Sequence, residues 1–252
     1  YGDRLHDPIE KMDEDLAAVI KRTFARGGKV IIPAFALERA QEIVFALKAL
    51  RRDGVLPPIP VFIDSPLTVQ ITEIFKLHPE CFDEETRALV RGHDSPFDFD
   101  GLRYIDDVED SKRLSSRPDP AVIIAASGMC EAGRVLHHLR TGVEDPKNTV
   151  LIVGFQAQHT LGRRLVERRA KVRIFGVERE RRAEVVVLNG FSAHADQGDL
   201  VRYADACNAE GTLRTVALVH GEPKAQAVLA ELLRANGHAR VVVPQPGDRL
   251  EW

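Results

Sequence analysis

Short apolar runs alternate with amphipathic stretches along the chain before residue 170. Runs of four to eight apolar residues between turn signals are typical of buried strands, whereas apolar positions three and four apart are typical of helices. The pattern predicts strands at 29–33, 61–63, 120–125 and 148–153 and helices at 9–25, 35–52, 66–77, 133–139 and 160–168. The repeated order of strand, tight turn and helix predicts an α/β fold with a doubly wound, mostly parallel sheet covered by helices.

Two later segments depart from this rhythm. The stretch 78–119 is less regular and predicts only a helical piece at 84–91 and a strand at 102–105. Residues 171–188 are charged and alternate in polarity, which indicates β-structure. The remainder returns to strand, helix and strand, with a final strand expected near Asp248–Trp252.

Two histidines follow predicted strands in this last part of the chain. Ser192, His194 and Asp196 lie in the turn after the apolar run 184–188, and His220 lies in the turn after 215–219. We expect both histidines at the C-terminal tips of strands of one sheet, where open α/β folds bind ligands. They could share a metal or a phosphate, although a single turn histidine is more often structural. A zinc site needs three or four protein ligands, and no other histidine or cysteine has suitable spacing.

Two further turns carry residues suited to anions. Ser127 and Gly128 follow the strand 120–125, and their main-chain N–H groups can face an anion. Thr160 can cap the helix that follows 148–153, and Arg163 can clamp a phosphate. The alternative is a tight turn in the first case and a solvated helix face in the second.

Composition and charge exclude several classes of protein. The 252 residues are 44% hydrophobic and 29% charged, which is ordinary for a globular protein. A net charge of -3 excludes a basic field over the whole molecule, so nucleic acid would bind in a local groove. The apolar runs are too short for a membrane span, and no signal peptide is visible. Three scattered cysteines argue against a disulfide framework and predict a cytoplasmic location.

These blocks together resemble the β-CASP branch of the metallo-β-lactamase superfamily in its bacterial or archaeal form. This branch comprises RNA-processing nucleases, among them ribonuclease J and the nuclease subunit of the cleavage and polyadenylation specificity factor. The resemblance rests on blocks in the family's order across nearly the whole chain: Tyr1-Gly2, Ile32–Glu42, Asp64–Leu67, Ala126–Met129, Gln156-Ala157, Thr160–Arg163, Phe191–Asp196 and Val219–Glu222.

The resemblance implies an organisation and a site. It places residues 1–190 in a β-CASP domain and residues 191–252 in the C-terminal strands and helices of a metallo-β-lactamase αββα domain. It implies two zinc ions per complete active site, which activate a hydroxide for RNA hydrolysis. In this chain it implies a catalytic His194, a zinc ligand His220, a supporting Asp196, and phosphate contacts from Ser127, Gly128, Thr160, Gly162, Arg163 and Ser192.

The chain also departs from the family pattern. The HxHxDH motif, a further histidine ligand, a bridging aspartate and an acidic motif would all precede Tyr1, and His159 replaces a frequent glycine. We therefore expect an N-terminal metallo-β-lactamase portion of the same protein to complete the site, and this chain by itself to be inactive. The expected partners are single-stranded RNA and that N-terminal portion, with a possible homo-oligomer and no membrane. The alternatives are a non-catalytic RNA-binding or partner subunit and a DNA-directed nuclease.

Overall fold

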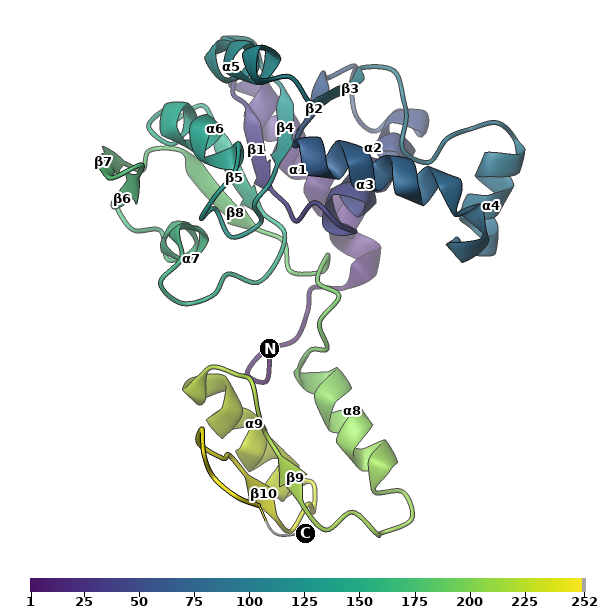
Figure 1. Ribbon diagram of the computed structural model, residues 1–252, viewed down its shortest axis with the longest axis vertical. Helices are drawn as coiled ribbons and strands as arrows, with labels where there is room; N and C mark the ends of the chain where they lie inside the picture. Colours follow the sequence, from purple (N-terminus) through teal and green to yellow (C-terminus); the bar gives the residue numbers. More distant parts are fainter. Residues whose placement is uncertain (251–252) are drawn as a thin grey trace. The chain divides into compact units, whose positions relative to one another are not determined.

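The computed structural model describes residues 1–250, which form two compact units (Figure 1). Residues 8–191 form the first unit, and residues 1–7 with those from Ser192 onward form the second. The sequence division grouped residues 1–190. In the structure, Tyr1–Asp7 pack with the second unit instead, because their hydrogen-bond partners lie there.

The first unit is built on a six-stranded sheet in which every pairing is parallel, in the order β3-β2-β4-β1-β5-β8. This confirms the predicted α/β fold. The strands are β1 Val30–Pro33, β2 Val61–Asp64, β3 Leu102–Ile105, β4 Val122–Ala125, β5 Thr149–Ile152 and β8 Glu184–Val187. An antiparallel hairpin, β6 Lys171–Ile174 with β7 Val177–Glu180, lies outside this sheet.

Helices cover both faces of the sheet (Figure 1). The helices of this unit are α1 Met12–Ala25, α2 Arg39–Arg52, α3 Pro66–Leu77, α4 Glu84–Arg91, α5 Val108–Ser116, α6 Val135–Gly142 and α7 Leu161–Val166, with single 3₁₀ turns at Ile9–Lys11 and Pro79–Cys81. Helix α4 buries no residue and does not contribute to this cover. Helix α5 was not predicted, because only Ser111 and Leu114 of its polar sequence are buried. Helix α2 begins later than predicted, because the chain first makes a turn that ends at Glu38 with φ 69°.

Alternation along the buried strands divides the core into two layers. Val30 and Ile32 of β1 pack with α1 and α2, whereas Ile31 packs on the other face with α6 and α7. Strands buried on both faces read as continuous apolar runs, which is why the sequence revealed them.

The second unit is smaller. It contains α8 Gln197–Cys207, α9 Pro223–Ala235 and a parallel pair of short strands, β9 Val216–Ala217 and β10 Val241–Val242. Its core comprises Ala204, Leu229, Ala230, Leu233 and Val241. Residues 248–250 are not a strand, and the rest of the predicted final strand, residues 251–252, lies outside the described residues. No helix within residues 1–250 has the length and apolarity that a bilayer span requires.

A buried carboxylate joins three elements of the first unit. Asp64, at the end of β2, accepts hydrogen bonds from Arg134 Nη1 at 2.7 Å, from Ser111 Oγ at 2.6 Å and from His138 Nε2 at 2.6 Å. Burial raises the pKa of Asp64, but the bonds from His138, Ser111 and Arg134 outweigh burial and hold that pKa below its usual value. The charge at the strand end is therefore tied to α5 and α6.

Asp64→Asn should lower the free energy of unfolding by about 3–5 kcal/mol, because an amide leaves buried donors without an ionised partner. A depressed folded-state pKa gives stability that is complete above the unfolded value of about 4 and is lost as the pH falls through the folded value. Denaturant unfolding from neutral to acidic pH measures both effects. The exposed Asp100→Asn is the matched control, and equal losses in the two variants would contradict the role of the network.

Candidate functional site

The turn that carries His194 is fixed by local hydrogen bonds. Asp196 Oδ1 accepts from the N–H of Asp199 at 2.9 Å, and Asp199 Oδ2 accepts from the N–H of Asp196 at 3.1 Å. This reciprocal pair forms a capping box at the start of α8. Ser192 Oγ accepts from the N–H of His194 at 3.3 Å, so Ser192 serves the turn itself. The His194 side chain remains exposed.

Two of the first residues of the chain, Tyr1 and His6, contact the same turn. His6 donates its main-chain N–H to Asp196 Oδ2 at 2.9 Å, and its Nε2 pairs with the carbonyl oxygen of His194 at 2.7 Å. The Tyr1 ring lies 4.6 Å from the His6 ring and stacks at 6.1 Å on that of His194, measured between centroids. The sequence alone predicted no role for His6. Its partners lie 188 and 190 positions away, so no local spacing indicates it.

Asp196 therefore supports His194 through the main chain. Hydrogen bonds from the N–H groups of His6 and Asp199 hold the pKa of Asp196 below its usual value. Within residues 1–250, no hydrogen bond joins the Asp196 carboxylate to the His194 ring. The Asp196 carboxylate thus fixes the main chain of the turn, and its predicted support of the His194 ring stays a prediction.

His220 lies three residues after β9 and adopts a left-handed conformation with φ 57°. Its side chain is exposed. The expectation that the histidines follow strands of one sheet is wrong: His194 comes after β8 of the six-stranded sheet, and β9 pairs with β10 in a separate sheet. The sequence showed two similar strand–turn units but carried no signal for which strands pair.

Residues 1–250 do not assemble a metal site by themselves. No group of three or more histidine, cysteine, aspartate or glutamate residues among them could hold a metal ion. His220 offers one exposed imidazole, whereas a zinc site takes three or four protein ligands. Of the three or four protein ligands that such a site needs, the predicted ligand His220 would therefore supply one.

The strand ends of the first unit bring the other five predicted residues to one edge of the sheet, where Gly128 and Gly162 are buried and the other three are half-buried. The turn after β4 contains Ser127 and Gly128, and the turn after β5 leads to Thr160, Gly162 and Arg163. Hydrogen bonds connect the turns. Gln156 Nε2 donates to the carbonyl oxygen of Gly128 at 2.9 Å, and the N–H of Gly162 donates to the carbonyl oxygen of Met129 at 3.1 Å.

The N–H groups at the start of α7 already have partners. The N–H of Leu161 donates to Glu131 Oε1. The N–H of Gly162 donates to the carbonyl oxygen of Met129, and the N–H of Arg163 donates to Thr160 Oγ. The predicted cap by Thr160 is confirmed. These donors hold the loops together, so a phosphate would have to displace a bond to use them.

The side chains of Ser127 and Arg163 are also engaged. Ser127 Oγ accepts from the N–H groups of Glu131 and Ala132, each at 3.3 Å, and so closes its own turn. Arg163 donates Nε to Glu167 Oε1 at 3.0 Å and Nη1 to the carbonyl oxygen of Gln156 at 3.3 Å. Phosphate contacts by these residues remain predictions.

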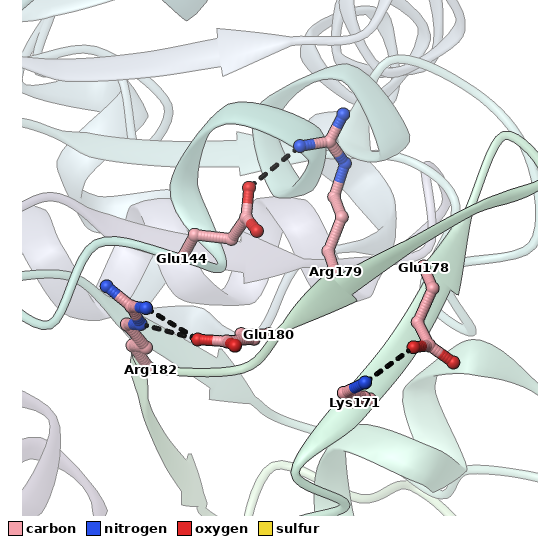
Figure 2. A pocket seen from close by; sticks show the side chains of 6 residues that line it. All are labelled: Glu144, Lys171, Glu178, Arg179, Glu180 and Arg182. Atoms are coloured by element: carbon pink, nitrogen blue, oxygen red, sulfur yellow. Dashed lines mark hydrogen bonds and ion pairs between the residues drawn. The ribbon is translucent and has the colours of Figure 1, made fainter.

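A hollow beside the β6–β7 hairpin is lined by charge and yet is electrically balanced (Figure 2). Its six side chains form three ion pairs: Arg179 with Glu144 at 2.8 Å, Arg182 with Glu180 at 2.5 Å, and Lys171 with Glu178 at 2.8 Å. Each cation has a carboxylate neighbour, so the hollow has no net charge to attract RNA phosphates. It is not a candidate for the functional site.

Gly162 permits the contact between the two turns. A Cβ at this position would lie 1.6 Å from Gln156 Oε1. Gly162→Ala should therefore displace Gln156 and lower the free energy of unfolding by about 1–3 kcal/mol. Gly154→Ala in the same loop is the matched control, because its Cβ would meet nothing within 4 Å. Denaturant unfolding of both variants tests this contact, and an unchanged midpoint for Gly162→Ala would refute it.

Comparisons with known proteins agree with this architecture. Residues 40–165 match the model of the Beta-Casp domain, and residues 178–244 match that of the Zn-dependent metallo-hydrolase RNA specificity domain. The first match covers most of the helices and strands of the first unit, and the second covers most of the second unit together with β8.

Similar proteins come from bacteria and archaea. The chain is 39% identical to Ribonuclease TTHA0252 of Thermus thermophilus over 94% of this chain and 53% of that protein. It is 34% identical to an RNase J-like protein of Methanocaldococcus jannaschii, over 81% of this chain and 46% of that protein. It is 32% identical to Transcription termination factor FttA of Methanosarcina mazei, over 88% of this chain and 35% of that protein. The chain thus spans about half or less of the length of these relatives, and it belongs to the β-CASP family of metallo-β-lactamase nucleases.

Proposed function

We propose that this chain is the β-CASP and C-terminal part of a zinc-dependent ribonuclease that hydrolyses phosphodiester bonds of single-stranded RNA. Family membership and the similarity to proteins named as ribonucleases support the reaction class. The observation that carries the proposal within the molecule is the exposed His194, in a turn fixed by Asp199 and by His6. An exposed imidazole on a fixed main chain is suited to act on a bound substrate.

The two histidines take different roles in this proposal. His194 donates a proton to a phosphate oxygen or to the leaving oxygen of the RNA. His220 supplies one neutral imidazole to the metal. When bound, zinc supplies an activated water and a positive charge beside the phosphate. The proposal assigns two zinc ions to a complete site, in keeping with the Zn-dependent description of the matched domain.

The remaining ligands come from an N-terminal metallo-β-lactamase portion of the same protein. This assignment is supported by the donor set of residues 1–250, which contains no metal-binding cluster. This chain by itself should therefore cleave no RNA. Three free cysteines, Cys81, Cys130 and Cys207, support a cytoplasmic location.

The experiment compares variants of a polypeptide that joins this chain to a metallo-β-lactamase portion. His194→Ala should lower the cleavage rate by roughly 10²–10⁴-fold and leave the zinc content unchanged, because the residue supplies only a proton. His220→Ala should lower both zinc content and rate. The exposed His93→Ala, in the first unit, is the control and should change neither. Loss of zinc in His194→Ala would refute the proton-donor role.

A second candidate function is a non-catalytic RNA-binding or partner subunit, which the lack of a metal cluster in residues 1–250 favours. The joined polypeptide discriminates the two. Zinc-loaded protein that binds RNA without cleaving it would support the second function. Matched RNA and DNA strands in the same assay establish the substrate, and preferential cleavage of DNA would replace ribonuclease with deoxyribonuclease.

A further inference from the structure

In the segment between β1 and α2, the small apolar side chains are buried and the large ones are exposed. The small side chains of Ala34 and Ala36 are buried, with 2% and 9% exposed, whereas the large apolar side chains of Phe35 and Leu37 are 47% and 60% exposed. Burial of the larger pair would remove more apolar surface from water and would be more favourable. Large apolar groups exposed together are typical of a binding surface.

The Phe35 ring is supported from one side by Gly128. A Cβ on Gly128 would lie 2.8, 3.0 and 3.1 Å from three consecutive ring carbons of Phe35. An edge-on approach would place the flanking carbons clearly farther than the central one, so the ring covers the glycine with its face. The side chain is half exposed, so a large part of the ring that does not cover the glycine can be reached from solvent.

The support beneath the ring is rigid. Gln156 Nε2 holds the carbonyl oxygen of Gly128, and the main-chain bond from Gly162 to Met129 ties the same turn to α7. Phe35 follows β1, which lies between β4 and β5 in the sheet. Its ring therefore lies in the middle of the strand-end surface, the edge at which open parallel sheets bind ligands.

We propose that Phe35 is a stacking platform for one nucleobase of single-stranded RNA. The inference rests on the proposed RNA substrate and adds a base-binding position to it. A flat aromatic face fixed on a glycine offers each base the same π surface, so the contact is tolerant of sequence. The main-chain donors at the start of α7 are occupied, which makes an apolar contact the available interaction at this surface.

The experiment measures the affinity of this chain for two fluorescent probes, a hexa-adenylate and an abasic ribose-phosphate strand of the same length. Phe35→Ala and Phe35→Leu should weaken hexa-adenylate binding by roughly 5- to 100-fold, because base–aromatic stacking is lost. Phe35→Trp should retain or strengthen it. Binding of the abasic strand should be the same in all variants, because it has no base to stack.

Phe175→Ala is the matched control. Phe175 is 50% exposed, like Phe35, but lies between β6 and β7 and packs on His137. Phe175→Ala should leave the affinities for hexa-adenylate and for the abasic strand unchanged. Phe35→Leu keeps an apolar side chain over Gly128, so its unfolding midpoint shows whether the fold survives.

Three outcomes would overturn the inference. If Phe35→Ala binds hexa-adenylate as well as the unsubstituted chain, or if it weakens both probes equally, Phe35 stacks no base while the proposed RNA substrate stands. If neither the unsubstituted chain nor the polypeptide that joins it to a metallo-β-lactamase portion binds either probe, the RNA substrate itself fails, and the base position fails with it.

Discussion

All strands of the six-stranded sheet run in one direction, and the placement of every candidate residue in the first unit depends on this constraint. In a parallel sheet, each segment that follows a strand emerges at the same edge. Phe35, Gly128 and Gln156, far apart in sequence, therefore meet beyond β1, β4 and β5. Two glycines then determine how closely these segments approach, because a Cβ at Gly128 or Gly162 would occupy space already filled.

The two units use their polar groups differently. In the first unit, the polar side chains and N–H groups at the strand ends mostly satisfy one another, which produces a firm surface with an apolar ring at its centre. In the second unit, hydrogen bonds fix the main chain around His194 and leave its side chain exposed. The first arrangement is suited to holding a ligand and the second to acting on it.

The sequence predicted the elements better than their pairing. The buried strands were recognisable as apolar runs between turns. Four of them occur within a residue or two of the predicted positions. Helix α5 went unnoticed because its sequence is polar, although Asp107 caps it with bonds from Glu109 and Asp110. That capping aspartate was the signal that could have revealed it.

Candidate site residues could be named from the sequence where a residue type in a turn carries its own chemistry, as at His194 and His220, and their roles stay predictions. The assignment of both to one sheet failed, because pairing depends on contacts that no local pattern records. His6 was missed for the same reason, since its role comes from two bonds to the distant turn. Phe35 was predicted to begin a helix, and only its exposure in the structure separates it from the core.

The bonds from His6 to the His194 turn also affect the order of events during synthesis. They join residues separated by 188 and 190 positions, whereas the larger unit lies entirely between them. Domains fold largely as units while the chain emerges from its N-terminus, so residues 8–191 can fold before the turn is made. The first seven residues must wait for their partners throughout that time. The turn that carries His194 can thus form only after the whole first unit has been synthesised, and a partly synthesised chain can contain a folded first unit without it.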